Sequence, residues 1–165
     1  MKLNTLHDLY LHQLKDLYSA ESQLVDALPD MAKEANHPDL KQAFSEHLQQ
    51  TKQQKSRLEK IGKNLGEDLD GETCQAMKGL IKEGKEMIKQ KAADPVKDAG
   101  LIAAAQRVEH YEIAGYGTVC TFAEMLGRHD DLQLLKETLS EEKNTDDKLN
   151  KIAKQAVDPA ALQPA

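Results

Sequence analysis

The stretch "QRVEHYEIAG", residues 106–115, decides how this chain can fold. Small and apolar residues recur every three or four positions along it and around it, which is the period of a buried helix face. Glu109 and Glu112 lie on or beside that apolar stripe. A carboxylate inside a helix bundle is costly unless an opposite charge meets it. The stretch therefore raises the question of which positive charge these two glutamates meet.

The size and composition of the chain favour long, solvated helices. Its 165 residues suit one domain with a sizeable core, and 30% of them are charged while only 4% are aromatic. The formal net charge of −6 at pH 7 disfavours nucleic acid or an anionic membrane as a partner. We therefore expect an all-α protein that binds neither.

The cysteines and the N-terminal residues predict a cytoplasmic location. Cys74 and Cys120 form no Cys-x-x-Cys pair, which is typical of a reduced compartment. The opening run "MKLNTLHDLYLHQLKDLY" is interrupted by polar residues throughout. It is typical of neither a signal peptide nor a membrane span.

Apolar periodicity predicts four long helices and one short one. We expect long helices over 3–34, over 38–65, from about 101 to 126 and from about 132 to 156, and a short helix over 72–91. The long helices form two antiparallel hairpins, which the segment with the short helix connects. A long crossover of this kind joins the halves of a ferritin-like four-helix bundle. We expect one domain over 1–157 and a frayed tail over 158–165.

Each long helix carries a polar interruption on its apolar stripe. These interruptions are Glu21, His47 with Thr51, Glu109 with Glu112, and Glu142 with Asp146. Taken singly, each one has a simpler reading as a boundary side chain that reaches solvent or as a hydrogen-bonded core group. Whether they converge decides between that reading and a binding site.

The hairpin geometry predicts that they converge. Residues at equal distances from the turn of an antiparallel helix pair face each other, so Glu112 matches a position midway between Glu142 and Asp146. In the same way, Glu21 matches a position within about one helical turn of His47 and its neighbours. Several carboxylates and one imidazole then meet near mid-bundle, where they cannot all ionise without a cation.

One or two metal ions would supply that cation. Carboxylate-rich sites with an imidazole suit iron or manganese, and pairs such as Glu109-x-x-Glu112 place two ligands on one helix face. Ferritin-like sites commonly take a Glu-x-x-His pair from each of two helices. This chain departs from that plan, because its second helix offers His47-x-x-Gln50 and its fourth helix offers no histidine.

Four stretches of the sequence carry a resemblance to a known family. They are "DLYSAESQL" at 16–24, "HLQQT" at 47–51, "LIAAAQRVEHYEIAGYGT" at 101–118 and "LKETLSEEKNTDDKL" at 135–149. With them the chain resembles the YciF/YciE family of ferritin-like bacterial stress proteins, and the YciF branch more than the YciE branch. The resemblance implies a ferritin-like fold, a homodimer, a cytoplasmic setting and a di-iron-type centre.

The resemblance also implies a ligand set. The family's candidate ligands map onto Glu21, His47, Glu109, Glu112, Glu142 and Asp146. Gln50 stands where relatives have a glutamate, so a neutral amide replaces one carboxylate. We expect this change to weaken the binding of a second metal ion on that side.

Three functions are compatible with these residues. The first is a di-iron redox protein that oxidises Fe(II) or reduces peroxide, with peroxide or oxygen as the small oxidant. The second is a non-enzymatic, stress-induced dimer that holds a structural or buffered metal ion or binds a partner protein. The third is a helical module without metal. The sequence assigns no catalytic residue.

Overall fold

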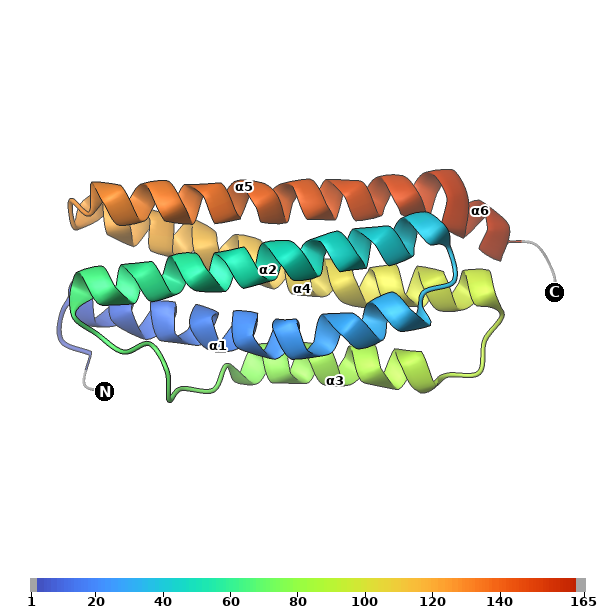
Figure 1. Ribbon diagram of the computed structural model, residues 1–165, viewed down its shortest axis with the longest axis horizontal. Helices are drawn as coiled ribbons and strands as arrows, with labels where there is room; N and C mark the ends of the chain where they lie inside the picture. The colour runs from blue at the N-terminus through green and yellow to red at the C-terminus, as the bar shows by residue number, and fades with distance from the viewer. Residues whose placement is uncertain (1–2, 163–165) are drawn as a thin grey trace.

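The computed structural model describes residues 3–162, and its secondary structure is helical (Figure 1). The long helices are α1 (Leu6–Glu34), α2 (Pro38–Leu65), α4 (Asp94–Met125) and α5 (His129–Ile152). A shorter helix, α3 (Gln75–Lys89), lies between the two hairpins in the chain. After α5 the chain continues through a π-helical turn (Ala153–Val157) into α6 (Asp158–Ala161).

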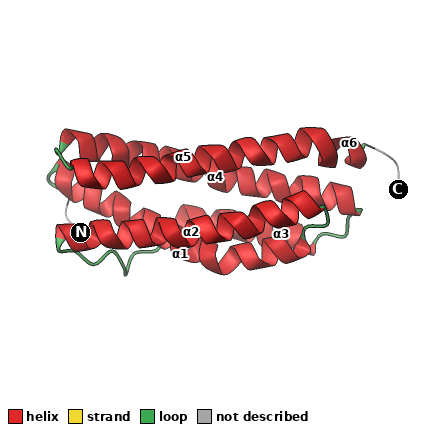
Figure 2. Ribbon diagram, turned by 45° about the horizontal axis from the view of Figure 1, so that its top comes forward, coloured by secondary structure: helices red, strands yellow, loops and turns green. Residues whose placement is uncertain are grey.

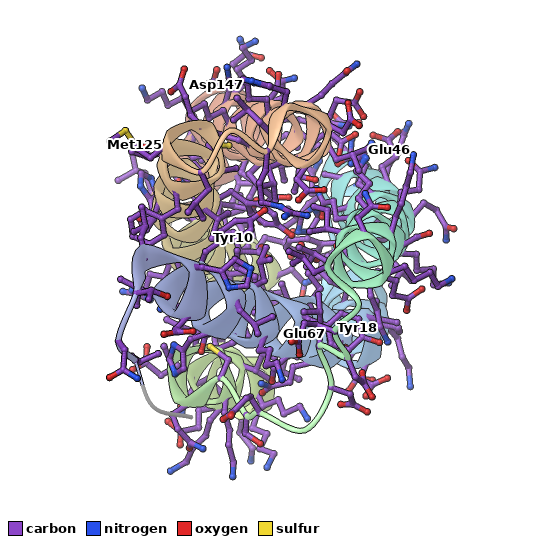
Figure 3. All side chains as sticks on the ribbon, turned by 90° about the vertical axis from the view of Figure 1, so that its left-hand side faces the viewer. Tyr10, Tyr18, Glu46, Glu67, Met125 and Asp147 are labelled. Atoms are coloured by element: carbon purple, nitrogen blue, oxygen red, sulfur yellow. The ribbon has the colours of Figure 1, made fainter. Side chains whose placement is uncertain are left out.

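The helices form the predicted ferritin-like bundle. Helices α1 and α2 make one antiparallel hairpin, α4 and α5 make the other, and α3 lies outside the four, against α1 and α4 (Figures 1 and 3). Figure 2 shows helix throughout, apart from short loops and one longer connection from α2 into α3. Between residues 3 and 162, no helix combines the length and the apolar character that crossing a membrane requires.

Two helices start later than predicted because capping groups fix their ends, whereas α4 and α5 start earlier than predicted, at Asp94 and His129. The first helix starts at Leu6 instead of Leu3, because Thr5 and Asp8 form a capping box there. The Thr5 hydroxyl accepts from the Asp8 backbone N–H, and the Asp8 carboxylate accepts from the backbone N–H of Thr5. The third helix starts later than predicted, at Gln75, where the Cys74 thiol accepts from the backbone N–H of Met77.

The predicted tail over 158–165 is helical in its first part. Helix α6 continues directly from the π-helical turn, whose Ala153 and Val157 are buried in an apolar cluster with Leu101 and Ile102 of α4. This burial holds the chain against α4 and keeps its backbone helical. Residues 163–165 of the predicted tail lie outside the described residues.

Helix α4 is the central element, because it packs against α1, α3 and α5. Glycines let two of these neighbours approach closely. A Cβ added at Gly115 would lie 2.8 Å from Leu17 Cδ2 of α1, and one added at Gly100 would lie 2.5 Å from Met87 Sδ of α3. Contact on several sides explains why small and apolar residues are frequent in and around "QRVEHYEIAG".

The buried Asp98 of α4 anchors the turn between α1 and α2. Its Oδ1 accepts from the Asn36 backbone N–H at 2.8 Å, and its Oδ2 accepts from the His37 backbone N–H at 2.7 Å. The Asn36 side-chain amide donates to Oδ1 as well, at 3.3 Å. Asp98 thus ties the first hairpin to the second.

We predict that Asp98→Ala lowers the free energy of unfolding by about 2–3 kcal/mol, because it leaves two backbone donors without their charged acceptor. Urea denaturation measures the change. The control is Asp147→Ala, which removes an exposed carboxylate from α5 (labelled in Figure 3) and should change stability by about 0.5 kcal/mol or less. Equal effects of the two substitutions would show that Asp98 is not an anchor.

Candidate metal centre

A group of four side chains meets in the middle of the bundle. It comprises His47 of α2, Glu109 and Glu112 of α4, and Glu142 of α5. One possible ligand atom from each lies within 4.8 Å of the others. His47 is 3% exposed, Glu109 is 1% exposed, and the two remaining glutamates are fully buried. We call these four residues the central cluster.

The helix geometry explains how the cluster forms. Glu109 and Glu112 are three residues apart and therefore share one face of α4. The antiparallel course of α4 and α5 places Glu142 opposite that face, as the equal distances from their turn require. His47 reaches the same point from α2. The side chains that converge thus come from both hairpins.

Several polar atoms of the cluster lack hydrogen-bond partners among the described residues. Both carboxylate oxygens of Glu112 have none, and neither do one oxygen each of Glu109 and Glu142. Nε2 of His47 lies 3.2 Å from Oε1 of Glu109, but the geometry is not that of a hydrogen bond. Each unsatisfied buried group costs about 1–3 kcal/mol, and a charged one costs more. This cost calls for a cation or for protons on the carboxylates.

Burial and mutual repulsion favour the uncharged forms of these groups. Burial raises the pKa of Glu109 and of Glu112 well above the usual range, and the nearby charge of Glu142 raises both further. Burial lowers the pKa of His47, so its imidazole is neutral near pH 7. A neutral imidazole is the form that binds a metal ion.

Glu21 of α1 lies beside the cluster but outside its 4.8 Å limit. It is fully buried, and its Oε1 accepts a hydrogen bond from the Tyr116 hydroxyl. Burial is the main cause that raises the Glu21 pKa, and the charge of Glu142 raises it further. The hydrogen bond from Tyr116 lowers it. Tyr116 was not predicted to belong to the site, although its position one turn after Glu112 on α4 was the available signal.

Gln54 of α2 is a second residue of the site that was not predicted from the sequence. It is fully buried, and its amide donates to Oε1 of Glu142 and, at 3.1 Å, to Oε2 of Glu141. Arg57 holds Glu141 with two bonds of 2.7 and 2.8 Å. This chain of contacts orients the Glu142 carboxylate. The available signal was the position of Gln54 on the apolar face of α2, two turns after His47.

Asp146 lies outside the 4.8 Å grouping of the central cluster, and Gln50 of α2 lies close enough to His47 to raise the His47 pKa. Asp146 is 14% exposed, accepts from the Gln106 amide at 3.1 Å and lies 3.5 Å from Nε2 of His110. Its charge also acts on Glu109, whose pKa it raises. Gln50 is half-buried, and its Oε1 accepts from the Thr145 hydroxyl at 3.3 Å. The place of Asp146 and of Gln50 in the ligand set stays a prediction.

Comparisons with known proteins agree with the fold. Residues 5–162 match the family described as Domain of unknown function (DUF892). Protein YciF of Escherichia coli (strain K12) is 46% identical over 154 residues, which cover 93% of each chain.

Two solved structures are similar over nearly their whole length. That of the E. coli stress protein YciF matches with a TM-score of 0.91 at 45% identity, covering 94% of this chain and 99% of that one. YcfI from Rhodopseudomonas palustris matches with a TM-score of 0.89 at 45% identity, covering 92% and 97%. The resemblance seen in the sequence is thereby confirmed.

The raised pKa values predict that the metal-free protein loses stability as the pH rises. Between the usual glutamate pKa and the raised one, the folded state binds more protons than the unfolded state, so the free energy of unfolding falls with increasing pH. The lowered pKa of His47 makes the free energy of unfolding rise with increasing pH below about pH 6.5. We therefore compare wild type with Glu112→Gln, which keeps the His47 contribution.

Thermal unfolding from about pH 5 to pH 8 measures this effect. We expect Glu112→Gln to stabilise the metal-free protein at pH 8 and to make its melting temperature less dependent on pH. Glu124→Gln, at an exposed position of α4, is the control and should follow wild type. A pH dependence that is identical in Glu112→Gln and wild type would contradict the prediction.

Proposed function

The chain belongs to the DUF892 family and is a relative of YciF, and we propose that it is a ferritin-like protein that binds iron at the central cluster. In this proposal, the bound iron serves to oxidise Fe(II) or to reduce peroxide. The observation that carries the proposal is the convergence of buried ligand atoms without hydrogen-bond partners among the described residues. Neutral residues would fill the same core space without the free-energy cost of burying unpaired polar atoms.

The donor set fits iron, and manganese is the alternative. One imidazole and three carboxylates are the ligand types of a carboxylate-rich redox metal, and a thiolate-selective metal fits them less well. His47 would supply the nitrogen, and the three glutamates would supply oxygens and negative charge. Glu21, with one oxygen already bonded to Tyr116, would serve a second ion beside the first. Bound iron would supply the electron transfer to oxygen or peroxide.

The surrounding residues have separate tasks in this proposal. Gln54 fixes the Glu142 carboxylate through its amide, and the Arg57–Glu141 pair fixes Gln54. Such contacts to ligands typically change metal affinity about 10–100-fold. The raised pKa values of Glu109 and Glu112 mean that protons leave these carboxyls when the ion binds, so affinity should rise with pH.

A second candidate is a protein that holds a metal ion without turnover. The observation that favours it is the neutral character of α2, whose buried polar groups near the cluster are His47, Thr51 and Gln54. The carboxylates come only from the other long helices, which suits one tightly held ion better than a redox pair. Catalytic oxidation of Fe(II) beyond the amount bound would exclude this candidate.

We predict that Glu142→Ala reduces the iron content of the purified protein by at least about tenfold, because Glu142 is both a ligand and the neighbour of all the other acids. Elemental analysis after expression in iron-supplemented medium measures it. Asp147→Ala, at an exposed position of α5, is the control and should keep the wild-type content. An unchanged iron content in Glu142→Ala would overturn the proposed site.

The prediction for Gln50 tests whether α2 limits the second ion. Gln50→Glu adds a carboxylate at nearly constant volume and should raise the metal content from about one ion per chain toward about two, together with any rate of Fe(II) oxidation. The exposed Gln49→Glu adds the same charge one residue away and should change neither. If affinity and stoichiometry stay unchanged in Gln50→Glu, Gln50 is not a ligand position.

A further inference from the structure

A small cavity lies under α3, between that helix and the α1–α4 pair. Its volume is about 40 Å³. Apolar side chains form most of its wall, among them Leu24, Leu28, Ile81 and Val108, while His47 and Glu109 of the central cluster also line it. The cavity therefore joins the apolar interface of α3 to one side of the proposed metal site.

Exposure changes along the cavity wall from the surface toward the cluster. Ile81 and Ile88 of α3 are half-buried, and Leu24 of α1 is buried. His47 and Glu109, at 3% and 1% exposure, are almost inaccessible. The cavity thus leads inward from the outer helix α3.

The size and chemistry of the cavity select its occupant. Apolar cavities stay dry and take up apolar molecules, and one of roughly 150 Å³ accepts benzene or xenon. At about 40 Å³, this cavity suits a diatomic gas or a single xenon atom and has no room for an alkyl chain or a peptide.

Two small residues keep the space open. Gly84 of α3 and Ala104 of α4 face each other, and a Cβ added at Gly84 would lie 3.9 Å from Ala104 Cβ and from Met31 Sδ. That distance is an ordinary contact, so a methyl group fits there. A leucine side chain would extend further and fill the cavity. The size of one residue on α3 therefore controls the space beside the cluster.

We propose that this cavity is a binding site for dioxygen, from which the gas reaches the His47–Glu109 side of the cluster. The role of this gas site in catalysis rests on the iron-dependent function proposed above. Gas binding itself depends only on the cavity, so the two can be tested separately.

Xenon is the probe for the cavity. Metal-free crystals pressurised with xenon should show a xenon atom between α1, α3 and α4 in wild type and none in Gly84→Leu. Gly79→Leu makes the same change on α3 where an added Cβ meets nothing within 4 Å, so it should bind xenon like wild type. Ala104→Ile fills the cavity from α4 and replaces Gly84→Leu if that variant does not fold. Absence of xenon from wild type, ordered water in its place, or equal xenon in the filled variants would overturn the proposal.

The iron-loaded protein supplies the second readout. Gly84→Leu should raise the oxygen concentration for half-maximal Fe(II) oxidation several-fold at unchanged iron content, and Gly79→Leu should not. An unchanged oxygen dependence in Gly84→Leu would overturn the route to the cluster. If wild type binds xenon but no iron, the proposed function fails and the gas site stands. If it oxidises iron but binds no xenon, the function stands and the cavity inference fails.

Discussion

Carboxylates without partners in the middle of a helix bundle are the constraint on which the rest of this structure depends. Glu109, Glu112 and Glu142 are buried within a few ångströms of each other, and the pKa values of the first two rise in response. Without a cation, the bundle would meet this constraint by keeping protons on its acids. A bound cation meets it by charge, without protons. Protons and a metal ion would therefore compete for the same atoms, and this competition would link stability, pH and metal affinity.

Burial of apolar side chains at both ends of the bundle offsets the free-energy cost of the central cluster. One cluster near the start of α1 contains Tyr10, Leu14 and Leu135, and another near the end of α1 contains Leu40, Phe44 and Leu149. These clusters lie on either side of the central cluster along the bundle axis. They fix the register of the helices, and that register brings the acids together. A shift of one residue in either hairpin would turn the ligands away from each other.

The sequence predicts the helices and much of the site, because both depend on periodicity. The stripes gave the four long helices, and equal distances from the turn brought Glu112 opposite Glu142. Matching of depths also selected Asp146, and its 14% exposure and its bond from the Gln106 amide place it at the edge of the central cluster. Gln54 and Tyr116 were missed because neutral polar residues on a stripe look like ordinary core. The cavity under α3 was beyond prediction, since it depends on how Gly84 and Ala104 meet across two helices.

The surroundings of the cluster differ in chemistry from one side to the other. Around Glu142, α2 and α5 supply an amide, a guanidinium and a further carboxylate, and the Arg57–Glu141 pair is partly open to solvent. Around His47 and Glu109, α1, α3 and α4 supply almost entirely apolar side chains. Ions and protons need polar partners along their path, whereas an apolar gas is best held where such partners are missing. The crossover helix α3 creates this difference, because it covers the flank of the bundle formed by α1 and α4 and leaves the flank formed by α2 and α5 uncovered.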